Sequence, residues 1–302
     1  MRFETNEKNI KTDIANCISR CMNATFKSCR SVPPQEPDFI ASLVEEIPMD
    51  LYNSLRAYAP GYNVAVSGVF CHQKPLANFG IGKKPELGDI LLVYIEESKH
   101  SNKKCNALLM QAKKIDKPPY VVHSAENHQL QLYEEWPTFK LARAGALNGT
   151  EINIEPKTLN AGAQYLLFQS PYKDEKKVCC AYPDKKLVPE KKLSDQIIDL
   201  MKFFTGRTFT LEPSEEDGWS NMILDLIRMS EVSTFNRRAS GRLNTDRKKS
   251  AGDIGILTEL NNIIGESTNV VEGAVSCLLI CVREDKNQED YYHQENLFDI
   301  DG

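Results

Sequence analysis

The sequence of 302 residues has no apolar run approaching the roughly 20 residues that a membrane-spanning helix needs. Its first residues, MRFETNEKNIKTD, are polar, whereas a secretory signal peptide requires an apolar stretch. We therefore expect a cytoplasmic protein with no membrane partner.

Motifs of several large enzyme classes are also missing. There are only five histidines, and none stands in a His-x-x-Glu-His pattern. The sequence has no nucleophile elbow and no glycine-rich phosphate loop of the Walker type. Zinc proteases, serine hydrolases and P-loop ATPases therefore lack support.

The nine cysteines are scattered, and several lie within apolar periodic segments. This distribution favours buried thiols in a reducing compartment. Cys17, Cys21 and Cys29 suggest zinc as an alternative. Cys17 and Cys21 are one helical turn apart, however, with no CxxC pair or histidine cluster nearby, so structural thiols are the default interpretation.

The formal net charge of −5 disfavours binding to phosphates by the chain as a whole, so local basic patches would have to provide it. One candidate is the lysine-rich stretch 99–117, which includes Lys114, and the other is the stretch 237–249, which includes Arg237, Arg238 and Arg242. Both stretches are also compatible with solvated loops, and the second with docking to an acidic partner surface.

The apolar content of 41% suits a globular protein, and the absence of repeats favours one domain over residues 1–302. Apolar spacing predicts helices over 10–26, 38–58 and 125–142, and strands over 63–71, 89–95, 106–112 and 164–169. We assign 38–170 to the core and 1–37 to an N-terminal helical extension.

Residues 171–302 are expected to form a mostly helical C-terminal extension with a late strand. The helices are predicted over 193–204, 219–229 and 255–264, and a basic loop over 234–250. The fully apolar stretch 275–282 predicts a strand that is buried on both faces.

Three residues of the central strands carry a recognisable chemistry. Asp89 opens one predicted strand, and Gln111-Ala112-Lys113 closes the next. Residues i and i+2 share a strand face, so Gln111 and Lys113 point the same way. Asp89, the amide oxygen of Gln111 and the carbonyl of Ala112 are hard ligands suited to Mg²⁺, and Lys113 supplies a cation for a reacting phosphate.

This combination of elements and residues resembles the PD-(D/E)XK nuclease superfamily. The resemblance implies an α/β restriction-endonuclease-like core, namely a helix, a three-stranded antiparallel sheet, a helix and a strand, with added N- and C-terminal helices. Gln111 departs from the usual acid, and its neutral oxygen is a weaker ligand. The superfamily often takes a further acid from the first core helix, where Glu46 lies closer to the apolar stripe than Glu45.

A second motif, Q-x-x-x-Y, is formed by Gln129 and Tyr133 on the predicted helix after Lys113. Similar spacing marks the recombination-repair exonuclease branch of the superfamily. One helical turn separates the two residues, so both would support the site from the same helix face. The alternative is a core tyrosine beside a surface glutamine.

The resemblance implies a Mg²⁺-dependent endodeoxyribonuclease, with Mn²⁺ as a possible substitute. Catalytic residues would be Asp89, Gln111, Lys113 and Glu46. DNA would be the substrate, and a sensor or motor subunit or a second copy of the chain would restrain the activity, as in antiviral defence assemblies. Two alternatives stay open: a catalytically silent nuclease fold that acts as a scaffold, and a partner-binding domain of another fold.

Overall fold

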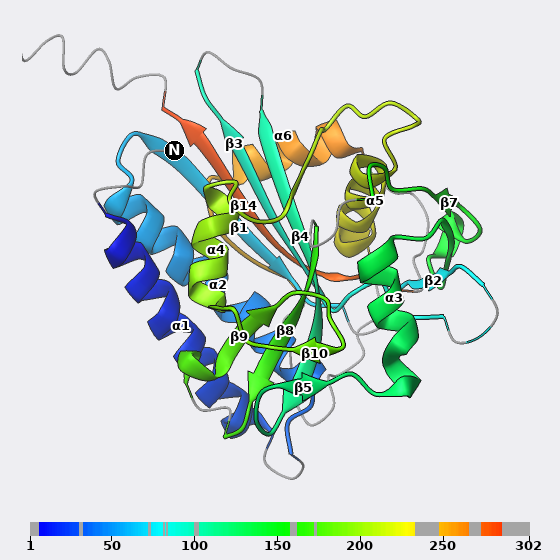
Figure 1. Ribbon diagram of the computed structural model, residues 1–302. Helices are drawn as coiled ribbons and strands as arrows, with labels where there is room; N and C mark the ends of the chain where they lie inside the picture. The colour runs from blue at the N-terminus through cyan, green and yellow to red at the C-terminus, as the bar shows by residue number, and fades with distance from the viewer. Residues whose placement is uncertain are drawn as a thin grey trace, which may run out of the picture.

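The structure is a computed structural model that describes residues 6–29, 33–71, 74–80, 82, 84–99, 103–157, 162–171, 174–232, 248–265 and 273–285. These residues form a mixed α/β fold (Figure 1). Its helices are α1 (Glu7–Ser28), α2 (Glu36–Tyr58), α3 (Asn127–Glu135), α4 (Leu193–Met201), α5 (Gly218–Val232) and α6 (Ile254–Ile264). Short 3-10 turns η1 (Ser124–Glu126), η2 (Gly145–Leu147) and η3 (Glu175–Lys177) occur between them.

One large mixed sheet runs through the fold. Its strands are β1 (Tyr62–Val69), β3 (Ile90–Glu97), β4 (Lys104–Ile115), β8 (Ala163–Gln169), β9 (Val178–Ala181), β11 (Lys191–Lys192), β12 (Arg207–Phe209), β13 (Lys248–Gly252) and β14 (Ser276–Glu284). Two small sheets lie beside it. They pair β5 (Tyr120–Val121) with β10 (Lys186–Leu187), and β2 (Leu76–Asn78) with β6 (Phe139–Ala142) and β7 (Glu151–Ile152).

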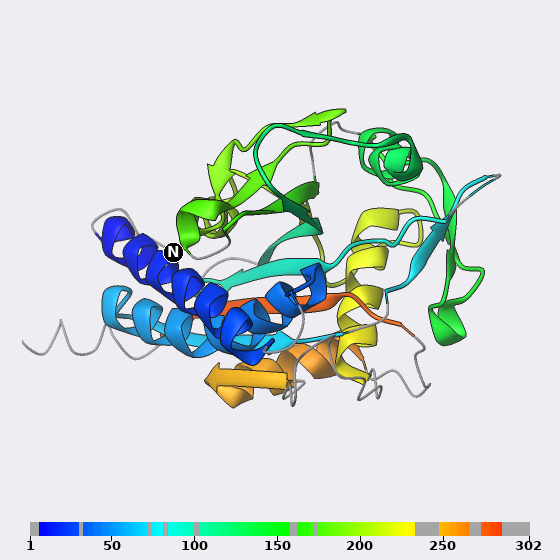
Figure 2. The same cartoon turned by 90° about the horizontal axis from the view of Figure 1, so that it is seen from below.

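The first two helices confirm the helices predicted over 10–26 and 38–58. They run side by side, as the blue ribbons of Figure 2 show. A capping box starts α2: the backbone N–H of Gln35 donates to Asp38 Oδ2 at 2.8 Å, which satisfies a donor left free at the helix end. Pro48 lies within α2 without ending it.

Alternating residues of the central strands fill two apolar clusters, one on each side of the sheet. Leu91 and Val93 of β3 pack with residues of α3, α5 and α6, and we call this side the α3 face. Ile90 and Leu92 pack with residues of α1, α2 and α4 on the α2 face. The period of two along the strand sends neighbouring residues to opposite sides.

Strand β14 lies at the centre of the sheet, although it comes last in the described chain. The order is β11-β9-β8-β4-β3-β14-β1-β13, with β14 parallel to β3 and antiparallel to β1. Cys277 and Leu279 contribute to the α3 face, whereas Leu278 and Ile280 contribute to the α2 face. Burial on both faces is therefore confirmed, but β1 does not pair with β3 as a three-stranded antiparallel core would require.

The helix predicted over 125–142 is too long. Helix α3 ends at Glu135, Trp136 takes a left-handed conformation with φ 45°, and β6 begins at Phe139. Pro137 lacks a backbone N–H and restricts the residue before it, which explains the break.

The C-terminal part contains more strand than predicted. Helices α4, α5 and α6 agree with the three predicted segments, but β9, β11, β12, β13 and β14 all belong to the main sheet. The predicted loop over 234–250 lies mostly outside the described residues, and its end forms β13. Short strands in polar sequence depend on pairing with a neighbour rather than on their own pattern.

Candidate active site

Asp89 and Gln111 meet where β3 begins and β4 approaches its end. Strand pairing places Ile90 opposite Met110, and the N–H of Asp89 donates to the Met110 carbonyl at 2.8 Å. The Gln111 amide nitrogen donates to Asp89 Oδ2. The backbone N–H of Ala112 donates to the same oxygen at 2.8 Å. The three residues therefore meet, but Asp89 is contacted by the Gln111 amide nitrogen and the Ala112 N–H, not by the amide and carbonyl oxygens that were predicted as ligands.

Burial makes Asp89 an unusual carboxylate. Its side chain is only 5% exposed, and this burial raises its pKa above the ordinary value. The charge of Lys74, the Ala112 N–H and the charge of Lys113 oppose the shift without cancelling it. Glu86, three residues earlier, also has a raised pKa because of burial and the charge of Asp89. A bound cation would relieve both effects, because it favours the ionised carboxylates.

Gln111 is also buried, and its amide is only half satisfied. Its nitrogen binds Asp89, but the oxygen Oε1 has no hydrogen-bond partner among the described residues. Buried polar atoms are nearly always hydrogen-bonded, so this oxygen is suited to accept a hydrogen bond or to bind a cation beside the carboxylate. A half-turn of the amide would exchange its oxygen and nitrogen in space.

Lys113 and Lys114 point to opposite sides of the sheet. Lys113 forms an ion pair with Glu126 of η1. The Lys114 ammonium instead donates to the Pro34 carbonyl at 2.6 Å, and its backbone N–H donates to Glu36 Oε1 at 3.1 Å. In the described structure Lys114 therefore holds the start of α2 against β4, and its predicted nucleic-acid contact would have to use the remaining N–H donors of the ammonium.

Glu46 lies away from this convergence. It is exposed on α2, and Glu45 is half-buried beside it. The α2 carboxylate whose charge reaches Asp89 is Glu36, which raises the pKa of Asp89 further. Ten residues of helix separate Glu36 from Glu46, or about 15 Å along the axis. The predicted approach of Glu46 to the site is thus not seen.

The Q-x-x-x-Y residues both lie on the buried side of α3. The Tyr133 hydroxyl donates to the Leu87 carbonyl at 2.9 Å, two residues before Asp89. Gln129 is buried one turn earlier, and its Nε2 has no partner among the described residues. Tyr133 therefore braces the loop before Asp89, and no hydrogen bond of the described residues gives the Gln129 amide nitrogen a part in this.

We expect Tyr133→Phe to lower the free energy of unfolding by about 1 kcal/mol, because the buried Leu87 carbonyl loses its donor. Urea denaturation followed by fluorescence measures the change. Tyr182→Phe is the matched control, since Tyr182 is 38% exposed. An equal effect of both substitutions would contradict a bracing role for the Tyr133 hydroxyl.

Sequence reasoning missed three charged groups that act on Asp89, namely Lys74, Glu86 and Glu36, and it missed Glu126, the partner of Lys113. Lys74 is 2% exposed, and its ammonium donates to the Cys71 carbonyl at 2.5 Å and to Ser276 Oγ at 3.2 Å. The nearness of Glu86 to Asp89 in the chain was the one available signal. The other three come from segments whose position depends on tertiary packing.

The basic stretch 237–249 contributes little to the described site. Arg237, Arg238 and Arg242 lie outside the described residues. Lys248 and Lys249 begin β13, which is separated from β3 by β14 and β1. The assignment of this stretch to DNA or to a partner stays a prediction.

The described residues contain no group of three His, Cys, Asp or Glu side chains arranged to hold a metal ion. Zinc at the cysteines thus gains no support. Cys17 and Cys21 are buried with their sulfur atoms 4.0 Å apart, and hydrogen bonding to Cys21 and burial raise the pKa of the Cys17 thiol. Any cation at Asp89 would need the amide and main-chain oxygens as well.

Within the described part of the chain, no helix has the length and apolar character required to cross a membrane. Comparison with known proteins gives no match to a protein-family model, to a curated protein or to a solved structure.

Proposed function

We propose that this chain hydrolyses DNA phosphodiester bonds with a divalent metal ion, Mg²⁺ or in its place Mn²⁺. The observation that carries the proposal is the meeting of buried Asp89 with Gln111, whose oxygen has no hydrogen-bond partner in the described part of the chain. The order of α2, β1, β3, β4, α3 and β8 agrees with the order expected for a PD-(D/E)XK core. The insertion of β14 between β1 and β3 departs from the expected pairing.

The available ligands fit a hard cation. Asp89 offers a carboxylate, Gln111 an unpaired amide oxygen, and Ala112 a peptide on the Asp89 side of β4. Oxygen ligands of this kind are what Mg²⁺ prefers, and it commonly keeps several waters. With the Gln111 amide turned so that its oxygen rather than its nitrogen faces Asp89, these residues would hold such an ion without three carboxylates.

When bound, the cation would lower the pKa of a coordinated water and offset charge on the phosphate. Asp89 and Gln111 would fix its position from two adjacent strands. Lys113 shares a strand face with Gln111 and would stabilise negative charge that develops on the phosphate oxygens. Burial excludes competing water from Asp89, which strengthens each of these interactions.

Gln111 is also the observation that favours a second function, a catalytically silent nuclease fold that binds nucleic acid or a protein subunit. A neutral amide binds a cation less strongly than a carboxylate, and Lys113 is paired with Glu126. Under either function, a partner subunit or a second copy would help an acidic chain to engage DNA through a raised effective concentration.

A plasmid-cleavage assay with Mg²⁺, Mn²⁺ or EDTA decides between the two. We expect the wild-type protein to nick plasmid only with metal, and Lys113→Ala to lose roughly 100-fold or more in rate, as removal of a transition-state charge does. Circular dichroism establishes that the variant is folded. Cleavage that survives EDTA, or a Lys113→Ala rate equal to the wild-type rate, would reject the catalytic proposal.

A further inference from the structure

Glu126 connects Lys113 to two other elements. Its Oε1 forms the ion pair with the Lys113 ammonium. Its Oε2 accepts a hydrogen bond from the Tyr120 hydroxyl at 2.6 Å and lies 3.3 Å from the backbone N–H of His123, which donates to it. One carboxylate thereby ties β4, β5 and the η1 turn together.

The surroundings of Glu126 favour a fixed geometry. The Lys113 and Glu126 side chains are 20% and 23% exposed, so the pair is largely shielded from solvent. Both carboxylate oxygens are engaged, and charge-assisted hydrogen bonds of this kind are among the strongest in proteins. Burial alone would raise the pKa of Glu126, but hydrogen bonds from Lys113 and Tyr120 outweigh it, and the carboxylate stays ionised.

A lysine without such a partner is poorly ordered. Its flexible four-carbon stem adopts many rotamers, and this freedom must be lost before the ammonium can meet a phosphate oxygen. The contact with Glu126 removes most of that freedom before any substrate arrives. It also holds Lys113 on the α3 face, where Gln111 and Asp89 lie.

We propose that Glu126 is a positioning residue, which holds the Lys113 ammonium at the end of β4 ready to meet the phosphate. This inference rests on the proposed nuclease function, because it assigns a role in that site. Glu126 acts through Lys113, and the hydrogen bond from Tyr120 holds the Glu126 carboxylate in place. Loss of Glu126 should then slow the chemical step more than it weakens DNA binding, since its own negative charge does not attract DNA.

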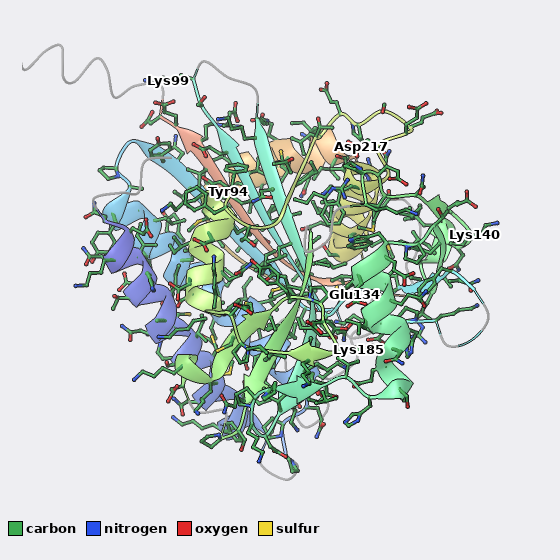
Figure 3. All side chains as sticks on the ribbon, in the orientation of Figure 1. Tyr94, Lys99, Glu134, Lys140, Lys185 and Asp217 are labelled. Atoms are coloured by element: carbon green, nitrogen blue, oxygen red, sulfur yellow. The ribbon has the colours of Figure 1, made fainter. Side chains whose placement is uncertain are left out.

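The test compares Glu126→Gln with Glu135→Gln in the full chain. Glu135 is exposed at the end of α3, where it accepts a hydrogen bond from Gln131, so Glu135→Gln makes the same chemical change away from Lys113. The first readout is acetylation of lysines by acetic anhydride, quantified by peptide mass spectrometry. We expect Lys113 to react several-fold faster in Glu126→Gln, with the exposed Lys140, labelled in Figure 3, as an internal reference.

The second readout separates kcat from KM for plasmid cleavage. A positioning role predicts that kcat falls roughly 10- to 100-fold, as expected when a reacting group is misplaced. We expect KM to change by less than about twofold on the same reasoning. Glu135→Gln should match the wild-type protein in both readouts.

Tyr120→Phe is a second test, which keeps the charges of Lys113 and Glu126 and can be used if Glu126→Gln does not fold. It removes one donor from the carboxylate and should raise Lys113 acetylation by a smaller factor. Unchanged acetylation in both variants overturns the proposal, as does faster acetylation with an unchanged kcat. If the wild-type protein shows no metal-dependent cleavage, the nuclease function fails, and acetylation alone still decides whether Glu126 holds Lys113.

Discussion

Asp89→Asn is expected to abolish metal-dependent cleavage while making the protein more stable at neutral pH. The loss follows because an amide cannot replace the negative charge that holds the cation. The gain follows because Asp89 is buried and its pKa is raised in the folded state. Asparagine has the same shape as aspartate, and its side-chain oxygen can accept the hydrogen bonds that Gln111 and Ala112 now donate to Asp89 Oδ2.

The pH dependence of the free energy of unfolding shows why Asp89→Asn should stabilise the protein. A raised pKa means that the folded state holds the Asp89 proton more tightly than the unfolded state does. Wild-type stability therefore decreases as pH rises from the ordinary value of 3.8 through the folded pKa. The gain in the free energy of unfolding from Asp89→Asn should be negligible in acid and reach on the order of 1 kcal/mol at neutral pH. Substitutions that remove an activity and stabilise the fold have effects of this size.

Denaturant unfolding at several pH values, beside the cleavage assay, measures both effects. Asp184→Asn serves as the control, because Asp184 is exposed. An Asp89→Asn protein that is less stable than the wild type throughout the pH range would show that the carboxylate is structural.

Gly68→Ala is expected to destabilise the fold by roughly 3–5 kcal/mol, as severe overpacking does. A Cβ at Gly68 would lie 1.8 Å from the Val44 carbonyl oxygen and 2.9 Å from Pro48 Cγ. Because the nearest atom belongs to the backbone of α2, no side-chain rotation relieves the clash. The helix must move off β1, which opens the core of the α2 face.

Gly80→Ala is the matched control, because a Cβ there meets nothing within 4 Å. We expect that control to change stability by less than about 0.5 kcal/mol. Thermal and urea unfolding of both variants measure the difference. A Gly68→Ala protein with wild-type stability would contradict the close approach of α2 to β1.

Local patterns identified the α-helices and the longer central strands of the described chain, and the residues at the centre of the candidate site. Apolar spacing identified α1 and α2, and the unbroken apolar run identified β14, because helix and strand periods are properties of neighbouring residues. The same reasoning placed Gln111 and Lys113 on one strand face. Their meeting with Asp89 followed from a single hairpin, whose register is set by local pattern and turn length.

Only the tertiary structure decided which distant segments complete that centre. The insertion of β14 beside β3 joins residues nearly two hundred positions apart, and no local period encodes the partner of a fully buried strand. That the charge of Glu36, and not that of Glu46, acts on Asp89 depends on where α2 crosses the sheet, which a helical wheel does not contain. The pairing of Lys113 with Glu126 arose because a turn folds back over β4, and such contacts are set by packing between elements.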